Sequence, residues 1–226
     1  MDTIALLNGL RFVDSFFPSG GYAFSSGLEA AVQAGAVRDA DSLSRYVDDL
    51  LRNGTGRCEA VAVSRAHEAS ANGDLSSAVE ADQELDAMKL CHDTRMASRQ
   101  MGRQVIRISA ERPEKILHEY RDAVEAGRSP GHLAVSLGLT LEACGWETEE
   151  AVAAYLYQTA VGLISAALKL LPIGQREAQH LLASWLPLIG ELSRTVESGA
   201  EMLSWTPVHD IHAMRHAQLE SRLFRS

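Results

Sequence analysis

Three histidines near the C-terminus have the spacing of possible metal ligands. His209, His212 and His216 are separated by three and four positions, so a helix would place them on one face. Imidazole nitrogens bind nickel, copper and zinc. The histidines lie in a terminal segment and Asp210 falls off their shared face, so they are candidate ligands and no metal site is firm.

Turn-forming residues are concentrated in FPSGGYAFSSGLE, residues 17–29. Gly20 and Gly21 can both adopt positive φ, which allows the chain to reverse sharply. Ser26 and Glu29 match the S-x-x-E capping box, which predicts that a helix begins at about the glycine between them. Turn and helix geometry therefore account for the glycines and the serine without any functional role.

Tyr22 and Phe24 on this turn are not explained by turn geometry. A tyrosine here could pack back on the core or face a partner, and the residues alone leave both possibilities open. Two catalytic motifs are excluded. The serines of the turn lie in no G-x-S-x-G elbow, and the chain contains no GK[ST] phosphate-binding loop.

An arginine occurs at every fourth position from Arg95 to Arg107, which would align four guanidinium groups along one side of a helix. This arginine ladder could be a solvated face that pairs with carboxylates of the chain. It could also be a surface for an anion or an acidic partner. Because no phosphate motif accompanies it, the first interpretation is favoured.

The composition is typical of a globular protein and argues against nucleic-acid binding. The 226 residues carry a formal net charge of -9, whereas nucleic-acid-binding domains usually have a basic surface. The three cysteines are widely spaced and form no CxxC pair, which favours a reducing compartment. The N-terminus has an acidic residue at position 2 and no basic stretch. We therefore expect no secretory signal and a cytoplasmic protein.

Helix signals recur along the whole chain, and the alternation typical of strands is absent. We predict an all-α fold, a single-domain bundle of about eight to ten helices over residues 1–205. Residues 206–226 form a tail that packs on this domain or extends from it. One long helix is predicted over residues 81–109. Polar residues interrupt the apolar stretch 151–171, so we interpret it as a buried helix and expect no membrane span.

Five sequence blocks, in order and nearly end to end, resemble the UreF family of urease accessory proteins. FPSGGYAFSSGLE matches that family's P-x-G-[GS]-[YF]-x-x-S-x-G-L-E pattern, and the last block matches its signature ending RLF-x-S. The other three blocks would be weak alone. After the first, the blocks are TRMASRQMG (94–102), GHLAVSLG (131–138), LKLLPIGQREAQHLL (168–182) and TPVHDIHAMRHAQLESRLFRS (206–226).

The resemblance implies a scaffold, itself no enzyme, that helps to insert nickel into urease. Members of the family bind a second accessory protein, UreD (UreH in some organisms), and this pair recruits the GTPase UreG to apo-urease. On this interpretation the chain holds no cofactor stably, because the complex handles nickel and the partner GTPase binds GTP. A homodimer within the complex is also implied.

The resemblance also transfers a partner-binding role to particular positions. Tyr22 falls on the aromatic of the N-terminal signature, where Gly20 and Gly21 would present it to a partner. Arg222 falls on the arginine of the C-terminal signature. Both are expected contacts through which the complex recruits the GTPase.

Four further residues complete the expected partner-binding surface. Lys169 and Gln175 flank a proline turn and are second candidates for contact. Leu223 and Phe224 would help to dock the tail, residues 206–226.

Two other functions remain open. The chain could bind nickel directly through His209, His212 and His216, although the first two are not typical of the family. It could also activate the GTPase by inserting an arginine, with Arg222 as the candidate.

Overall fold

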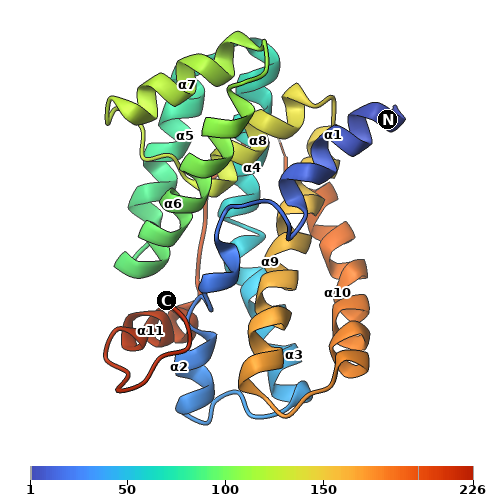
Figure 1. The fold of residues 1–226 in the computed structure, drawn as a ribbon, viewed down its shortest axis with the longest axis vertical. Coiled ribbons are helices and arrows are strands. Elements are labelled where there is room, and N and C mark those ends of the chain that lie inside the picture. Colours follow the sequence, from blue (N-terminus) through green and yellow to red (C-terminus); the bar gives the residue numbers. More distant parts are fainter. Residues whose placement is uncertain (1, 198, 226) are drawn as a thin grey trace.

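The computed structural model describes residues 2–197 and 199–225, and the regular elements of these residues are all helical (Figure 1). They comprise eleven α-helices, one 3-10 turn and one π-helical turn. The all-α prediction is confirmed, with one helix more than the expected range. The elements are α1 (Thr3–Val13), η1 (Gly21–Ala23), α2 (Leu28–Gln33), α3 (Ala40–Leu50), η2 (Leu51–Thr55), α4 (Glu59–Asn72), α5 (Leu75–Met88), α6 (His92–Ser109), α7 (Lys115–Glu125), α8 (Leu133–Ala143), α9 (Thr148–Leu170), α10 (Gln175–Thr195) and α11 (Pro207–His216).

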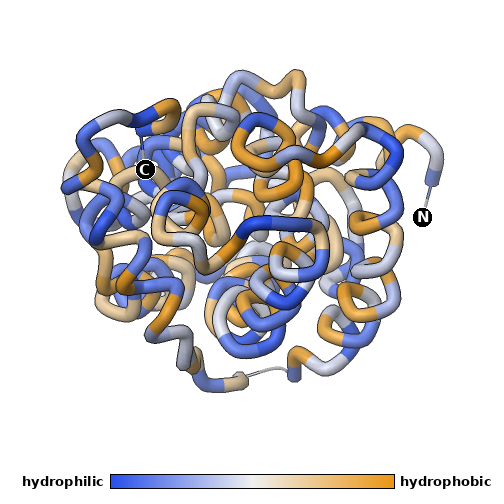
Figure 2. The backbone as a smooth tube through the Cα atoms, turned by 90° about the horizontal axis from the view of Figure 1, so that it is seen from below, coloured by the Kyte–Doolittle hydropathy of each residue, from blue (hydrophilic) through white to orange (hydrophobic). Residues whose placement is uncertain are grey.

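Helix α8 lies in the core of the bundle. Every residue from Leu133 to Leu141 is buried, and α4, α6 and α9 pack around it. Its sequence, LAVSLGLTLEA, is apolar nearly all round, as expected of a helix without a solvent face. Figure 2 shows hydrophobic and hydrophilic residues mixed along most turns of the chain.

Helix α9 packs between α10 and α4. Among the described residues it is the one helix long and apolar enough to cross a membrane, and half of its most apolar window is buried within the fold. Buried side chains such as Tyr155, Leu156 and Leu163 face its neighbours. The prediction of a helix packed in the core is therefore confirmed.

One buried carboxylate joins α5, α7 and the loop before α8. Asp82 Oδ2 accepts hydrogen bonds from the Tyr120 hydroxyl at 2.9 Å, the Ser129 hydroxyl at 2.6 Å and the Gly131 amide at 2.6 Å. Its Oδ1 accepts from the His132 amide at 2.9 Å. Because a buried carboxylate is tolerated only when donors surround it, these contacts fix the loop that leads into the central helix.

The prediction of one helix over residues 81–109 is wrong. Helix α5 ends at Met88, Lys89 adopts an extended conformation, and α6 begins at His92. At this break the Lys89 ammonium lies 2.6 Å from the Glu59 carboxylate of α4, while Leu90 is exposed. The break coincides with this ion pair to α4. The pattern along the chain carries no information about α4, so the sequence reads as one continuous helix.

The C-terminal part of the chain returns across the body of the protein before it forms α11. The Leu203 amide donates to the Arg57 carbonyl at 3.0 Å, and the Trp205 amide donates to the Asn53 carbonyl at 2.9 Å. Helix α11 then packs against α2 and α6. Figures 1 and 2 both place the C-terminal end on the opposite side of the molecule from α1.

Candidate partner-binding surface

Tyr22 projects from the turn that precedes α2. Gly20 has a left-handed conformation, with φ of 80°, and the 3-10 turn η1 follows directly. Tyr22 is 80% exposed, so it faces solvent rather than the core. Gly21 does not adopt positive φ as the sequence suggested; the second left-handed glycine of the stretch is Gly27, with φ of 85°.

The predicted capping box of Ser26 and Glu29 is wrong. Helix α2 begins at Leu28 with Gly27 as its N-cap and without a capping side chain. Ser26 itself has a positive φ of 52°. Glu29 is buried, at 1% exposure, and its carboxylate binds the C-terminal segment instead of the helix start.

The Glu29 carboxylate accepts three hydrogen bonds from residues near the end of the chain. Its Oε2 accepts from His216 Nε2 at 2.8 Å and from the Phe224 amide at 3.2 Å, and its Oε1 accepts from the Leu223 amide at 2.7 Å. Burial alone would raise the pKa of Glu29, but these hydrogen bonds and the nearby imidazole lower it. One ionised carboxylate thus ties α2 to the C-terminal segment.

The C-terminal loop, residues 217–225, packs beside the turn that carries Tyr22. The Arg225 amide donates to the Ala23 carbonyl at 2.8 Å. The Lys169 ammonium lies 5.1 Å from the centroid of the Phe224 ring, which is buried, whereas Leu223 is 72% exposed. The loop therefore directs one apolar side chain inward and presents the preceding one to solvent.

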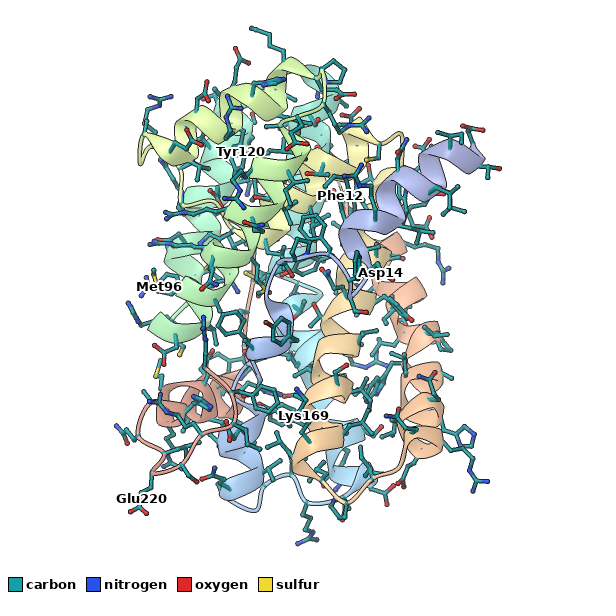
Figure 3. The ribbon with its side chains drawn as sticks, in the orientation of Figure 1. Phe12, Asp14, Met96, Tyr120, Lys169 and Glu220 are labelled. Carbon is teal, nitrogen blue, oxygen red and sulfur yellow. The ribbon has the colours of Figure 1, made fainter. Side chains whose placement is uncertain are left out.

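Turn and loop together line a surface pocket, which we call the turn–tail pocket. Its lining contains two cations and no acidic side chain, so it suits an anionic group from a partner. Figure 3 shows Lys169 on α9, where that helix faces the C-terminal loop. The lining residues are Gly20, Tyr22, Ala23, Gln100, Lys169, Leu223, Phe224 and Arg225.

The structure brings most, though not all, of the expected partner-binding residues to this pocket. Arg222 lies next to it in the C-terminal loop, is exposed, and makes no ion pair with any described residue. Gln175 begins α10, is exposed, and lies outside the lining. Gly21 lines an adjoining, partly open cavity instead. The expected residues that line the pocket are Gly20, Tyr22, Lys169, Leu223 and Phe224.

The three candidate metal-binding histidines share the buried face of α11, and they have different neighbours. His209 Nε2 contacts the Tyr46 carbonyl at 2.9 Å, and His216 Nε2 contacts a buried carboxylate. The pKa of His212 is lowered by burial and by nearby positive charge. Among the residues that the structure describes, no three histidine, cysteine or acidic side chains are grouped to hold a metal ion. The predicted common face exists, and it packs against the body of the protein.

A partly open cavity of about 310 Å³ adjoins the turn. The ion pair of Glu59 and Lys89 lines it, as does Cys58. Burial, together with the negative charge of Glu59, raises the pKa of the Cys58 thiol to about 12. Such a thiol stays protonated near neutral pH and is a poor nucleophile. The positive charge of Lys89 lowers the pKa of this thiol, but burial and Glu59 outweigh it.

The arginine ladder is partly engaged within the chain. Arg99 pairs with Asp86 of α5 at 2.5 Å, and Arg103 donates to the Pro130 carbonyl at 3.3 Å. Intramolecular pairing with a carboxylate is thus confirmed at Arg99.

Glu29 is a contact of the C-terminal segment that the sequence did not predict. A signal was present, because Glu29 is the one acid in the apolar run GLEAAV and an acid on a buried helix face needs donors. Its partners lie 187 to 195 positions away, and no local pattern identifies them.

The chain is similar in sequence to known proteins over nearly its whole length. The UreF family model matches residues 37–186. Three curated relatives, each named urease accessory protein UreF, match nearly end to end. The relative from Actinobacillus pleuropneumoniae serotype 3 is 32% identical over 96% of this chain and 97% of its own length. The Bacillus sp. TB-90 and Cereibacter sphaeroides relatives are 30% and 32% identical, each over 98% of this chain and 99% of its own length.

The family model covers α3 to most of α10, and the relatives extend the match to 96–98% of the chain. The family model matches more than half of the chain, and relatives at 30% identity or more cover nearly all of it. The chain belongs to the UreF family of urease accessory proteins.

Proposed function

We propose that this protein acts by binding, as a non-catalytic scaffold in the cytoplasm. It joins UreD (UreH) to the GTPase UreG, as a dimer within the complex, and so supports insertion of nickel into apo-urease. The chain carries no resident cofactor in this role; nickel is the cargo of the complex, and GTP is bound by the GTPase.

The observation that carries the proposal is the turn–tail pocket in a chain of this family. Tyr22 stands 80% exposed at its edge, and the exposed Arg222 adjoins it. Tyrosine and arginine are the side chains that most often dominate binding energy at protein interfaces. Lys169 and Arg225 add positive charge to the lining, which favours an acidic partner segment.

The test is co-purification. The tagged chain is co-expressed with UreD and UreG of the same organism and analysed by size exclusion with GTP or GDP. We expect a three-protein complex from the native chain, whereas Tyr22→Ala and Arg222→Ala keep UreD and lose the GTPase. Matched controls are Tyr157→Ala and Arg45→Ala, exposed residues outside the pocket lining, which should keep both partners. Absence of a complex with the native chain would contradict the proposal.

The same material tests whether Arg222 acts in GTP hydrolysis. A scaffold leaves the hydrolysis rate of the GTPase unchanged or slows it. Faster hydrolysis with the native chain, abolished by Arg222→Lys, would instead assign an inserted arginine to the reaction.

A further inference from the structure

We propose that Glu29 is a positioning residue: its carboxylate holds the C-terminal loop where that loop completes the turn–tail pocket. The inference rests on the proposed function only for the identity of the partner that the pocket binds. Glu29 does not itself line the pocket, so it acts through the residues that it ties down.

The geometry is that of a buried acceptor surrounded by donors from one segment. Glu29 is 1% exposed and His216 is fully buried. A carboxylate can only accept, so His216 carries its proton on Nε2, and its Nδ1 has no hydrogen-bond partner. The amides of Leu223 and Phe224 complete the set. Hydrogen bonds to an ionised acceptor in a buried site are stronger than those between neutral groups.

Few other contacts hold the backbone of the C-terminal loop to the body of the protein. Within the described residues, the Arg225 amide bonds to the Ala23 carbonyl, and Gln33 Nε2 donates to the Ser221 carbonyl at 3.1 Å. Glu29 accepts from the two amides between these points. It therefore controls the stretch in which the side chains alternate between buried and exposed positions.

This alternation decides which side chains of the loop are exposed to a partner. With the amides of Leu223 and Phe224 fixed on Glu29, the Phe224 ring lies under Lys169 and Leu223 faces solvent. Arg222 is thereby held in the exposed part of the loop. If Glu29 releases the loop, Arg222 and Leu223 no longer have a fixed position relative to Tyr22, although all three side chains are still present.

Glu29→Gln is the informative substitution because it preserves size and removes the charge. A glutamine side chain has a single acceptor oxygen, and its amide nitrogen would face donor groups. The matched control is Glu142→Gln, which changes another carboxylate with a hydrogen-bond partner, the Ser70 hydroxyl at 2.6 Å, far from the C-terminal loop in the fold. His216→Gln is the conservative variant, because it keeps an N–H that can donate to Glu29.

Two readouts are needed on the full-length chain: amide hydrogen exchange of the C-terminal loop, and retention of the GTPase in the co-purification with UreD. In Glu29→Gln we expect the amide hydrogens of Leu223 and Phe224 to exchange at least about tenfold faster than in the native chain. This is the factor that the loss of one strong hydrogen bond predicts. The exchange of α8 should not change, and the GTPase should be lost. His216→Ala should show the same effects more weakly, and His216→Gln should restore both.

The inference is overturned if Glu29→Gln folds and leaves the exchange of the loop unchanged. It is equally overturned if the loop is released and the GTPase is still retained. If the native chain retains no GTPase, the proposed function fails, and the exchange data alone then decide whether Glu29 holds the C-terminal loop. If Glu29→Gln does not fold, His216→Ala, which leaves the carboxylate in place, is judged by the same two readouts.

Discussion

Asp82 and Glu29 are two buried carboxylates with the same chemistry and different consequences. Asp82 is fully buried and Glu29 is 1% exposed. Each accepts two backbone amides together with side-chain donors, Asp82 from two hydroxyls and Glu29 from an imidazole. The chain therefore uses one device, a buried carboxyl group surrounded by hydrogen-bond donors, in two places.

The difference lies in what each carboxylate holds. The donors to Asp82 lie 38 to 50 positions along the chain and belong to α7 and the loop before α8, inside the core. The donors to Glu29 lie 187 to 195 positions away, in the last residues of the chain. Loss of the first should weaken the whole fold, whereas loss of the second should open one terminal segment. A buried charge can thus serve stability or presentation, depending on the segment that it ties.

The largest effect is expected at Asp82. Asp82→Ala leaves four buried donors without an acceptor, and we expect the free energy of unfolding to fall by about 3 to 5 kcal/mol. Chemical denaturation monitored by circular dichroism measures this. A loss below that of Glu29→Gln in the same assay would break the comparison.

A steric change at the start of α2 should have the next largest effect. A Cβ on Gly27 would lie 2.8 Å from the Ala213 backbone nitrogen of α11, at φ of 85°. Strain and overpacking together should cost Gly27→Ala about 2 to 4 kcal/mol. The control is Gly35→Ala, where φ is 73° and a Cβ meets nothing within 4 Å. Its loss should be about 1 to 2 kcal/mol, from backbone strain alone, and equal losses in thermal unfolding would contradict the packing argument.

Acid should release the C-terminal loop before it unfolds the core. The pKa of Glu29 lies below its usual value of 4.5, so the stabilisation is fully present above that value and is lost as pH falls through the lowered pKa. Exchange protection of the Leu223 and Phe224 amides, corrected for intrinsic rates, should fall by about tenfold over this interval. In Glu29→Gln it should be low and independent of pH, and protection in native α8 should outlast that of the loop.

The smallest effect on stability is expected for the residues that the loop presents. Tyr22 and Arg222 are exposed, so Tyr22→Ala and Arg222→Ala should change the free energy of unfolding by less than about 0.5 kcal/mol. Retention of the GTPase should nevertheless be lost. A loss above 1 kcal/mol, measured by denaturation, would mean that these side chains support the fold. Residues that contact the partner could then not be told apart from residues that hold the loop.

Much of the fold could be predicted from sequence because its signals are local. The apolar runs of α8 and α9, the helix-ending glycines and the lack of strand alternation indicate an all-α bundle without knowledge of any neighbour. Gly20 marked the reversal that exposes Tyr22. The local prediction that failed was the capping box. Ser26 and Glu29 have the right spacing, but the Glu29 carboxylate binds His216, Leu223 and Phe224 instead of the start of α2.

The sequence by itself determined that the chain is helical throughout, where it reverses at Gly20, and which residues were worth testing. Only the tertiary structure decided that Lys89 breaks a helix to reach Glu59, and that His209, His212 and His216 face inward toward different neighbours. It also decided that Glu29 meets the amides of Leu223 and Phe224. Helix propensity and periodicity act between residues a few positions apart, whereas each of these contacts joins helices or loops that packing alone brings together.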